Sequence, residues 1–187
     1  SDRLFGLLNG VDDSWDPRND ALIPATYDSE SLDRKALNRE ALLARMGLMP
    51  AAREVAVFGI VSRLAAQKGF DLLLETLPRL FSQADARLVV LGSGEPRYEA
   101  FFTQLQRQQP GRVGFYRGFS NELAHLIEAG ADIFLMPSRY EPCGLNQMYS
   151  LRYGTVPLVR RVGGLADTIQ PWDRLSGEGN GFSFRPF

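Results

Sequence analysis

The chain has 187 residues, enough for one domain with a substantial core, and its 21 Lys and Arg against 22 Asp and Glu give a formal net charge of −1. This balance gives no electrostatic case for nucleic acid or an anionic membrane as a partner. One cysteine excludes an internal disulfide, no signal-peptide pattern opens the chain and no apolar run approaches the roughly 20 residues of a membrane span, so we expect a cytoplasmic protein.

Residues 1–30 form a turn-rich lead-in that we interpret as a connection to another domain, because Asn9-Gly10 and Pro17 are turn residues. Residues 31–46 then predict an amphipathic helix that stops at Gly47. The chain starts within apparent structure and ends directly after a plausible strand, so we expect an excised domain. The apolar face of this first helix would consist of Leu32, Ala36, Leu37, Ala41, Leu42 and Met46.

Residues 31–187 predict one domain in which strands alternate with helices. Continuous apolar runs rich in β-branched residues indicate strands buried on both faces, and each is followed by a segment of helical periodicity. This alternation is typical of an α/β fold with a doubly wound, Rossmann-like parallel sheet. The predicted strands are 55–64, 88–91, 113–117, 131–136, 155–160 and 181–184; the predicted helices are 70–81, 97–108, 121–129 with Ser120 as N-cap, one opening after Gly144 and one after Gly163-Gly164.

Residues 138–168 join a strand end, a loop, a helix, a further strand and another helix start. Parallel sheets bind ligands in loops at the carboxyl ends of their strands. Both helices here begin with small residues, and helix N-termini present free N–H groups with a partial positive charge. The stretch therefore predicts an anionic ligand, most simply a phosphate.

Arg63 and Lys68 follow the first strand of the predicted sheet. A guanidinium that grips two oxygens and a compact ammonium at one strand end suit a diphosphate. The alternative is a pair of solvated surface cations. Glu141, in the loop before Gly144, is either a surface carboxylate or a group aimed at sugar hydroxyls or a developing positive charge.

Other residues of the chain favour structural roles. Cys143 could be a nucleophile only with His125 as its base, and a small packed residue is the simpler interpretation. His125 has no metal-ligand pattern around it, so we expect no metal. Gly92-Ser93-Gly94 lacks the third glycine of a dinucleotide fingerprint and indicates a tight turn. Phe119 is a core residue or a platform for a base.

Four ordered motifs together resemble the bacterial glycogen synthases and, more widely, the plant starch synthases. They are NGVDDSWDPRND (9–20), VSRLAAQKGFDLL (61–73), SRYEPCGLNQMYSLRYGTVPLVRRVGGLADT (138–168) and NGFSF (180–184). The resemblance implies the C-terminal, donor-binding half of a two-domain GT-B glycosyltransferase. That enzyme would be a retaining glucosyltransferase that uses ADP-glucose to extend an α-1,4-glucan, without a cofactor.

The resemblance also implies roles for individual residues. Arg63 and Lys68 would hold the distal phosphate of the donor, and Glu141 would lie at its glucose. The remaining donor contacts implied are Asn9 near the cleft, Phe119 on the adenine, Cys143, Gly144 and Leu145 at the helix N-terminus, Asn146 beside them, and Gly163-Gly164 in the neighbouring loop.

The sequence departs from the expected pattern at a few positions. Tyr149 stands where many related transferases have a second glutamate, which fits the bacterial synthases, while Asn146 and Val162 stand where threonines are expected. The glucan would bind through an N-terminal domain, so we expect the isolated chain to be inactive. Two alternatives stay open, a UDP-sugar-dependent retaining transferase and a non-catalytic nucleotide-binding module. A phosphorylase that uses pyridoxal phosphate is excluded, because it needs a lysine to hold the cofactor and neither Lys35 nor Lys68 is placed for that role.

Overall fold

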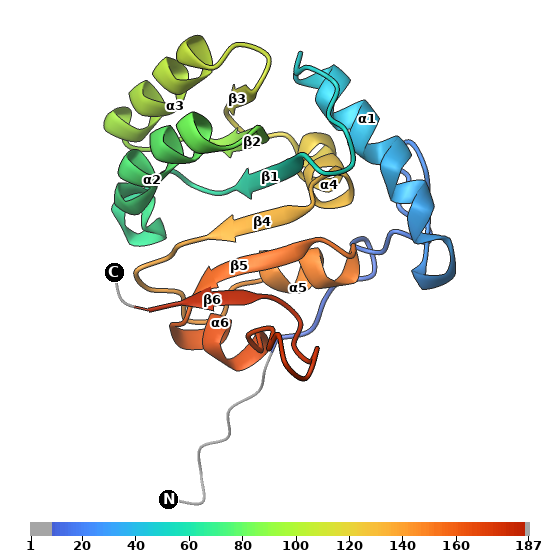
Figure 1. Ribbon diagram of the computed structural model, residues 1–187. Coiled ribbons are helices and arrows are strands. Elements are labelled where there is room, and N and C mark those ends of the chain that lie inside the picture. Colours follow the sequence, from blue (N-terminus) through green and yellow to red (C-terminus); the bar gives the residue numbers. More distant parts are fainter. Residues whose placement is uncertain (1–8, 186–187) are drawn as a thin grey trace, which may run out of the picture.

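In the computed structural model, which describes residues 9–185, six parallel strands form one sheet whose arrows all point the same way (Figure 1). Their order across the sheet is β3-β2-β1-β4-β5-β6, which confirms the predicted doubly wound arrangement. The strands are β1 (Ala56–Val61), β2 (Ala86–Gly92), β3 (Val113–Arg117), β4 (Ile133–Met136), β5 (Val156–Arg160) and β6 (Phe182–Phe184).

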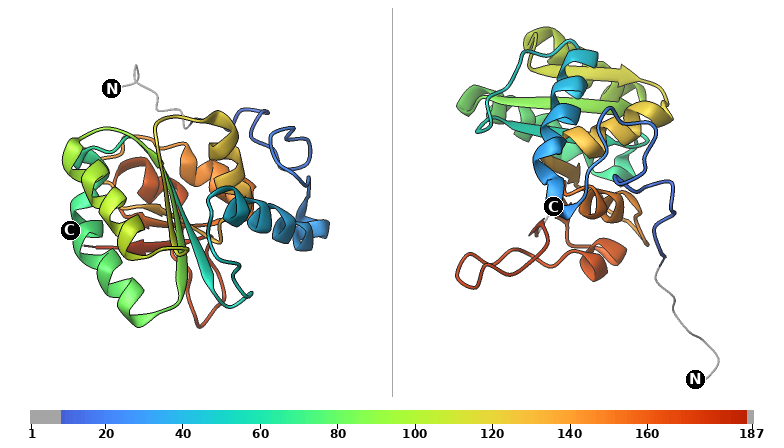
Figure 2. Two further views of the ribbon diagram at one scale, coloured as in Figure 1. Left: turned by 90° about the horizontal axis from the view of Figure 1, so that it is seen from above. Right: turned by 90° about the vertical axis from the view of Figure 1, so that its right-hand side faces the viewer.

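Helices cover both faces of the sheet, because successive side chains of each strand point to opposite sides. In β2, Leu88 and Val90 contact the layer of α2 and α3, whereas Val89 and Leu91 belong to the core shared with α1, α4 and α6. Figure 2 shows the two layers from above. The helices are α1 (Lys35–Arg45), α2 (Phe70–Gln83), α3 (Pro96–Gln108), α4 (Asn121–Gly130), α5 (Asn146–Arg152) and α6 (Gly163–Thr168), with 3-10 turns η1 (Ser29–Arg34) and η2 (Ala66–Lys68). No helix among the described residues has the length and apolar character needed to span a membrane.

The winding of the chain reverses between β1 and β4, which are neighbours in the sheet. The connection after β1 crosses one face through α2, and the connection after β4 crosses the other through α5. The loops that leave these two carboxyl ends therefore diverge and leave a crevice between them, the usual ligand position in such sheets.

The first helix departs from the prediction in two ways. It begins as η1, is kinked at Ser31, and becomes α-helical only at Lys35. Leu32 and Leu37 are exposed, so the expected apolar face is wrong in part. The buried face instead carries Asn38, whose amide exchanges two hydrogen bonds with the backbone of Ala25, at 2.9 and 2.7 Å. A polar residue thus fixes how the helix is rotated.

The strand predicted over 55–64 also ends early. β1 stops at Val61, and beyond it only Leu64 makes an isolated parallel bridge, to Gly94. The apolar run continues because Leu64 is fully buried, although its backbone has left the ladder. Ser120 is confirmed as the N-cap of α4, since its hydroxyl accepts from the Leu123 N–H.

Residues 9–28 run beside α4 and α5, as the blue segment in both views of Figure 2 shows. The Trp15 indole stacks between the rings of His125 and Tyr149. The distances between ring centroids are 3.7 Å to His125 and 4.1 Å to Tyr149. The buried carboxylate of Asp20 accepts from the Tyr153 hydroxyl at 2.6 Å and contacts His125 Nδ1 at 2.8 Å. The proposed division of the chain at residue 30 stays a prediction.

Two ionisable groups, the half-buried Lys35 and the buried Glu128, lie where α1 meets α4 and α5. The ammonium of Lys35 contacts the carbonyls of Glu128, Ala129 and Tyr153 and the Thr155 hydroxyl, so it caps two helix C-termini at once. Burial lowers the pKa of Lys35 to about 7 and raises that of Glu128 to about 8. Each shift arises because desolvation disfavours the charged form.

Replacing Asp20 by Ala should destabilise the fold strongly. The substitution leaves the buried Tyr153 hydroxyl and the His125 ring without their acceptor, which costs roughly 3 kcal/mol. Urea denaturation measures the change, with the exposed Asp13→Ala as the matched control. A loss no larger than that of the control would contradict a structural role for this cluster.

Glu128→Gln should change how stability depends on pH. Between about pH 4.5 and 8 the folded chain keeps a proton on Glu128 that the unfolded chain releases. The contribution of this group is therefore complete below pH 4.5 and is lost as the pH rises through 8. The free energy of unfolding of the variant, relative to the wild type, should rise across this window in denaturation curves at pH 5, 6.5 and 8. Parallel pH profiles would refute the assignment.

Candidate functional site

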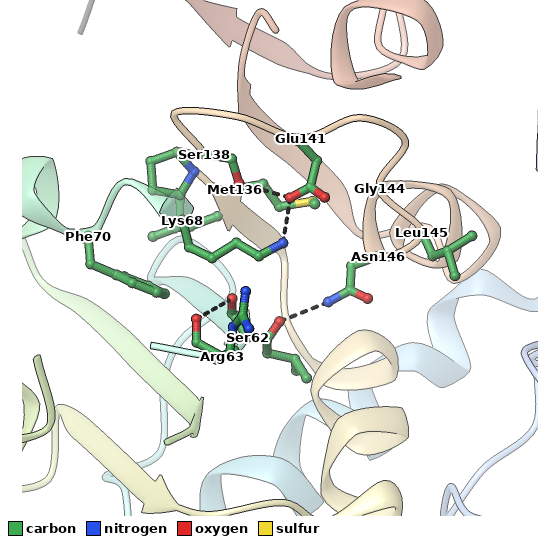
Figure 3. Close-up of a pocket in the computed structure, with 13 residues that line it drawn as sticks. Ser62, Arg63, Lys68, Phe70, Met136, Ser138, Glu141, Gly144, Leu145 and Asn146 are labelled. Atoms are coloured by element: carbon green, nitrogen blue, oxygen red, sulfur yellow. Dashed lines mark hydrogen bonds and ion pairs between the residues drawn. The ribbon is translucent and has the colours of Figure 1, made fainter. Parts of the chain in front are cut away.

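A cavity of about 360 Å³ lies in the crevice between the loops that follow β1 and β4 (Figure 3). One wall comes from the end of β1 and from η2, and the other comes from the end of β4 and the start of α5. It thus occupies the position expected of a ligand site at the reversal of a doubly wound sheet. Its lining residues are Val61, Ser62, Arg63, Lys68, Phe70, Leu135, Met136, Pro137, Ser138, Glu141, Gly144, Leu145 and Asn146.

An ion pair joins the two walls of this cavity. The Lys68 ammonium lies 2.6 Å from Oε2 of Glu141, and the Ser138 hydroxyl donates to the same oxygen at 3.1 Å. In Figure 3 the lysine and glutamate side chains point toward one another across the cavity. Glu141 is only 8% exposed, so the alternative of a surface carboxylate is wrong. Lys68 is likewise no solvated surface cation, because its side chain is 24% exposed.

Arg63 lines the same cavity from the end of β1 but is itself exposed. Two cations and one carboxylate thus line the same cavity. Their combined charge is positive, which favours an anion in the cavity. The ammonium of Lys68 has three N–H donors and gives one to Glu141, so the others can bind further oxygens.

The start of α5 forms the far wall of the cavity. Gly144 has φ of 72°, a backbone conformation that favours glycine, and a Cβ there would lie 2.5 Å from the Gln147 amide oxygen. The Asn146 amide donates to the Val61 carbonyl at 2.8 Å and ties α5 to the end of β1. Leu145 lines the cavity between them.

Gln147 contributes to this region, although the sequence reasoning missed it. Its buried amide donates to the carbonyls of Cys143 and Gly144 and contacts the Thr168 hydroxyl, so it joins α5 to α6. A polar residue inside an otherwise periodic helix was the available signal. Its contact with Thr168, 21 positions later in the chain, could not be read from the pattern.

Gly163 and Gly164 begin α6 directly against the loop that carries Glu141. A Cβ at either position would lie 2.1 Å from a carbonyl oxygen, that of Glu141 or of Cys143. The Gly164 N–H donates to the Glu141 carbonyl at 3.0 Å. The glycine pair therefore holds the Glu141 loop from behind and does not line the cavity.

Cys143 and His125 do not form a catalytic pair. The His125 ring contacts Asp20 and Trp15. The Cys143 thiol accepts a hydrogen bond from the Asn9 amide at 3.1 Å and donates one to the Gly144 carbonyl. In the described part of the chain no hydrogen bond joins the two residues, so the nucleophile alternative is wrong. Asn9 accordingly lies beside the Glu141 loop, outside the cavity lining.

Phe119 follows β3, at the same edge of the sheet as the cavity. Its side chain is 82% exposed, so the interpretation as a core residue is wrong. It lies outside the cavity lining, as does the exposed Tyr116 in β3. Tyr149 stacks on Trp15 and lies outside the cavity lining.

No cluster of three or more His, Cys, Asp or Glu side chains suited to a metal ion occurs within residues 9–185. The chemistry available at the cavity is that of two cations, a carboxylate and backbone N–H groups. Such a set can bind an anion and stabilise negative charge that develops on it.

Sequence comparison links the chain to known proteins over its whole length. The family model described as glycosyl transferases group 1 matches residues 50–186. Glycogen synthase of Myxococcus xanthus is 55% identical over 186 residues, which are 99% of this chain, and that of Geobacillus thermodenitrificans is 50% identical over 187 residues, 100% of the chain. The chain spans 38% of the length of each of these relatives.

Structural comparison agrees. The catalytic domain of starch synthase IV from Arabidopsis thaliana, a structure bound to ADP and acarbose, matches with a TM-score of 0.88 at 34% identity, over 96% of this chain and 38% of that one. The C-terminal domain of the group 1 family protein LpcC from Francisella tularensis shares the fold, with a TM-score of 0.64 at 18% identity, over 91% of this chain and 80% of that one. With glycogen synthases as its homologues, the chain belongs to the glycosyl transferases group 1 family and has the Rossmann-like fold of a GT-B C-terminal domain.

Proposed function

We propose that this chain is the donor-binding domain of a retaining glucosyltransferase that transfers glucose from ADP-glucose to the non-reducing end of an α-1,4-glucan. The observation that carries the proposal is the Lys68–Glu141 pair inside the cavity at the reversal of the sheet. The relatives named glycogen synthase support the reaction, and the starch synthase structure bound to ADP supports the nucleotide. A cytoplasmic location stays a prediction.

Lys68 and Arg63 would bind the distal phosphate of the donor. As the nucleoside diphosphate leaves, negative charge grows on that phosphate, and two fixed cations stabilise the charge without reorganisation of water. Arg63, at the exposed rim of the cavity, can approach two oxygens in a fork, while Lys68 supplies a compact charge from the inner wall.

Glu141 would lie at the glucose of the donor. The leaving diphosphate itself deprotonates the acceptor on the same face of the sugar, so the reaction needs no protein nucleophile. A buried carboxylate beside this position can accept hydrogen bonds from sugar hydroxyls. It also stabilises the positive charge that develops at the anomeric carbon. Its ion pair with Lys68 keeps it pointed into the cavity.

The remaining donor contacts are assigned from the family pattern. The exposed ring of Phe119 would stack on the adenine, which explains why an aromatic side chain stays in water without ligand. Backbone groups of Cys143, Gly144 and Leu145 would contact the sugar and phosphate, and Asn146 would adjust these contacts. Asn9 and the pair Gly163-Gly164 would support the loop that carries Glu141.

Lys68→Ala and Arg63→Ala should each weaken ADP binding. Loss of a charge-assisted contact costs roughly 1.5–3 kcal/mol, with Arg63 at the lower end because it is exposed. Calorimetric titration of the 187-residue chain with ADP and with UDP measures both affinity and base preference. Arg107→Ala, an exposed cation in the last turn of α3, is the matched control. Preference for UDP, or ADP binding unaffected by both substitutions, would contradict the proposal.

The 187-residue chain should bind ADP without elongating glucan. The cavity presents donor-type chemistry, and the acceptor would bind to parts of the relatives beyond the 38% that this chain matches. Incorporation of labelled glucose from ADP-glucose into glycogen measures this, with a full-length glycogen synthase as the positive control. Elongation by the purified chain would show that one domain suffices.

A further inference from the structure

The turn Gly92-Ser93-Gly94-Glu95 packs directly against the loop that carries Arg63 and Lys68. A Cβ at Gly92 would lie 2.0 Å from the Ser62 carbonyl oxygen, and one at Gly94 would lie 2.2 Å from that of Leu64. These glycines allow two backbones to meet without a side chain between them.

Backbone hydrogen bonds hold this contact in register. The Leu64 N–H donates to the Ser93 carbonyl at 2.9 Å, and the Glu95 N–H donates to the Leu64 carbonyl at 2.7 Å. The two loops thus continue the pairing of β1 and β2 beyond the sheet. The position of the loop after β1 is set by the turn after β2.

The Glu95 side chain extends this contact to η2. Its Oε1 accepts the Ala66 N–H at 2.7 Å. Ala66 is the first residue of η2, and the residue before it, Ala65, has no side chain that could cap the turn. Glu95 therefore caps η2 from another element, and Lys68 is the last residue of that turn.

Glu95 is in turn fixed by charged neighbours. Its Oε2 lies 3.0 Å from Nε of Arg97, whose guanidinium reaches Asp71 at 3.3 Å. Asp71 contacts Arg139 at 3.2 Å, two positions before Glu141, and the Arg139 N–H donates to the Gln67 carbonyl at 2.8 Å. The carboxylate that caps the lysine turn is thus linked to both walls of the cavity.

We propose that Glu95 is a positioning residue for donor binding: by capping η2 it holds Lys68 where the distal phosphate of the donor must lie. This inference rests on the proposed function, and it assigns Glu95 no contact with the donor. Its physical content is that an ammonium on a four-carbon stem gives a directed contact only if the backbone beneath it is fixed.

The test compares ADP with AMP, which lacks the distal phosphate. Glu95→Ala should weaken ADP binding about tenfold, the size of one loosened charge-assisted contact, and change AMP binding less than twofold. Glu95→Gln keeps an acceptor for the Ala66 N–H and should stay within about threefold of the wild type. In a Lys68→Ala background, Glu95→Ala should cause no further loss. Glu75→Ala removes an exposed carboxylate of α2 and is the matched control.

Equal weakening of ADP and AMP, or no weakening of either, would overturn the proposal while leaving the donor site intact. Amide hydrogen exchange gives a readout that needs no ligand: the Ala66 and Lys68 N–H groups should exchange faster in Glu95→Ala than in Glu75→Ala, with β1 unchanged. If the wild-type chain bound no nucleotide, the proposed function would fail for this chain and the exchange rates alone would decide. Unchanged exchange at Ala66 would then refute the capping role.

Discussion

The site depends on one topological constraint, the reversal of winding between two neighbouring parallel strands. Because α2 and α5 leave β1 and β4 toward opposite faces, no connection can close the space above these two strand ends. The charged groups Arg63, Lys68 and Glu141 reach the cavity from the two diverging connections. The amino ends of the same strands lie at the opposite edge of the sheet. There Asp132 and Arg39 form an ordinary ion pair.

Close backbone contacts then decide which side chains enter this space. Gly92, Gly94, Gly163 and Gly164 lie so near carbonyl oxygens that any side chain would collide with the neighbouring loop. Because these glycines have no side chain, the loops after β1, β2, β4 and β5 can pack against one another. This packing fixes the backbone that carries Lys68 and Glu141. The resulting pair of Lys68 and Glu141 is partly desolvated, so each charge gains more from a partner than it would in water. An anionic ligand in the cavity would be attracted to the Lys68 ammonium in the same way as the Glu141 carboxylate is.

The sequence predicted the sheet, its strand positions and the charged residues of the cavity, because apolar periodicity and strand-end positions are local patterns. It could not predict the rotation of α1, since Asn38 binds a backbone segment that precedes the helix. The exposure of Phe119 was equally hidden, because an aromatic residue after a strand most often packs inside. Glu95 was passed over as part of a turn. Its role depends on Ala66, 29 positions earlier, which no periodicity reveals.

The strand order also combines pairings that are local along the chain with one that is distant. β1, β2 and β3 pair with strands adjacent along the chain, whereas the Val57–Asp132 contact at the β1–β4 junction spans 75 positions. Synthesis delivers the amino-terminal half first, and long loops close late. Lys68 and Glu141 stand 73 positions apart in the chain. Their ion pair can therefore form only when the two halves of the sheet have come together. An anion held between these two residues therefore stabilises only chains in which both halves of the sheet have come together.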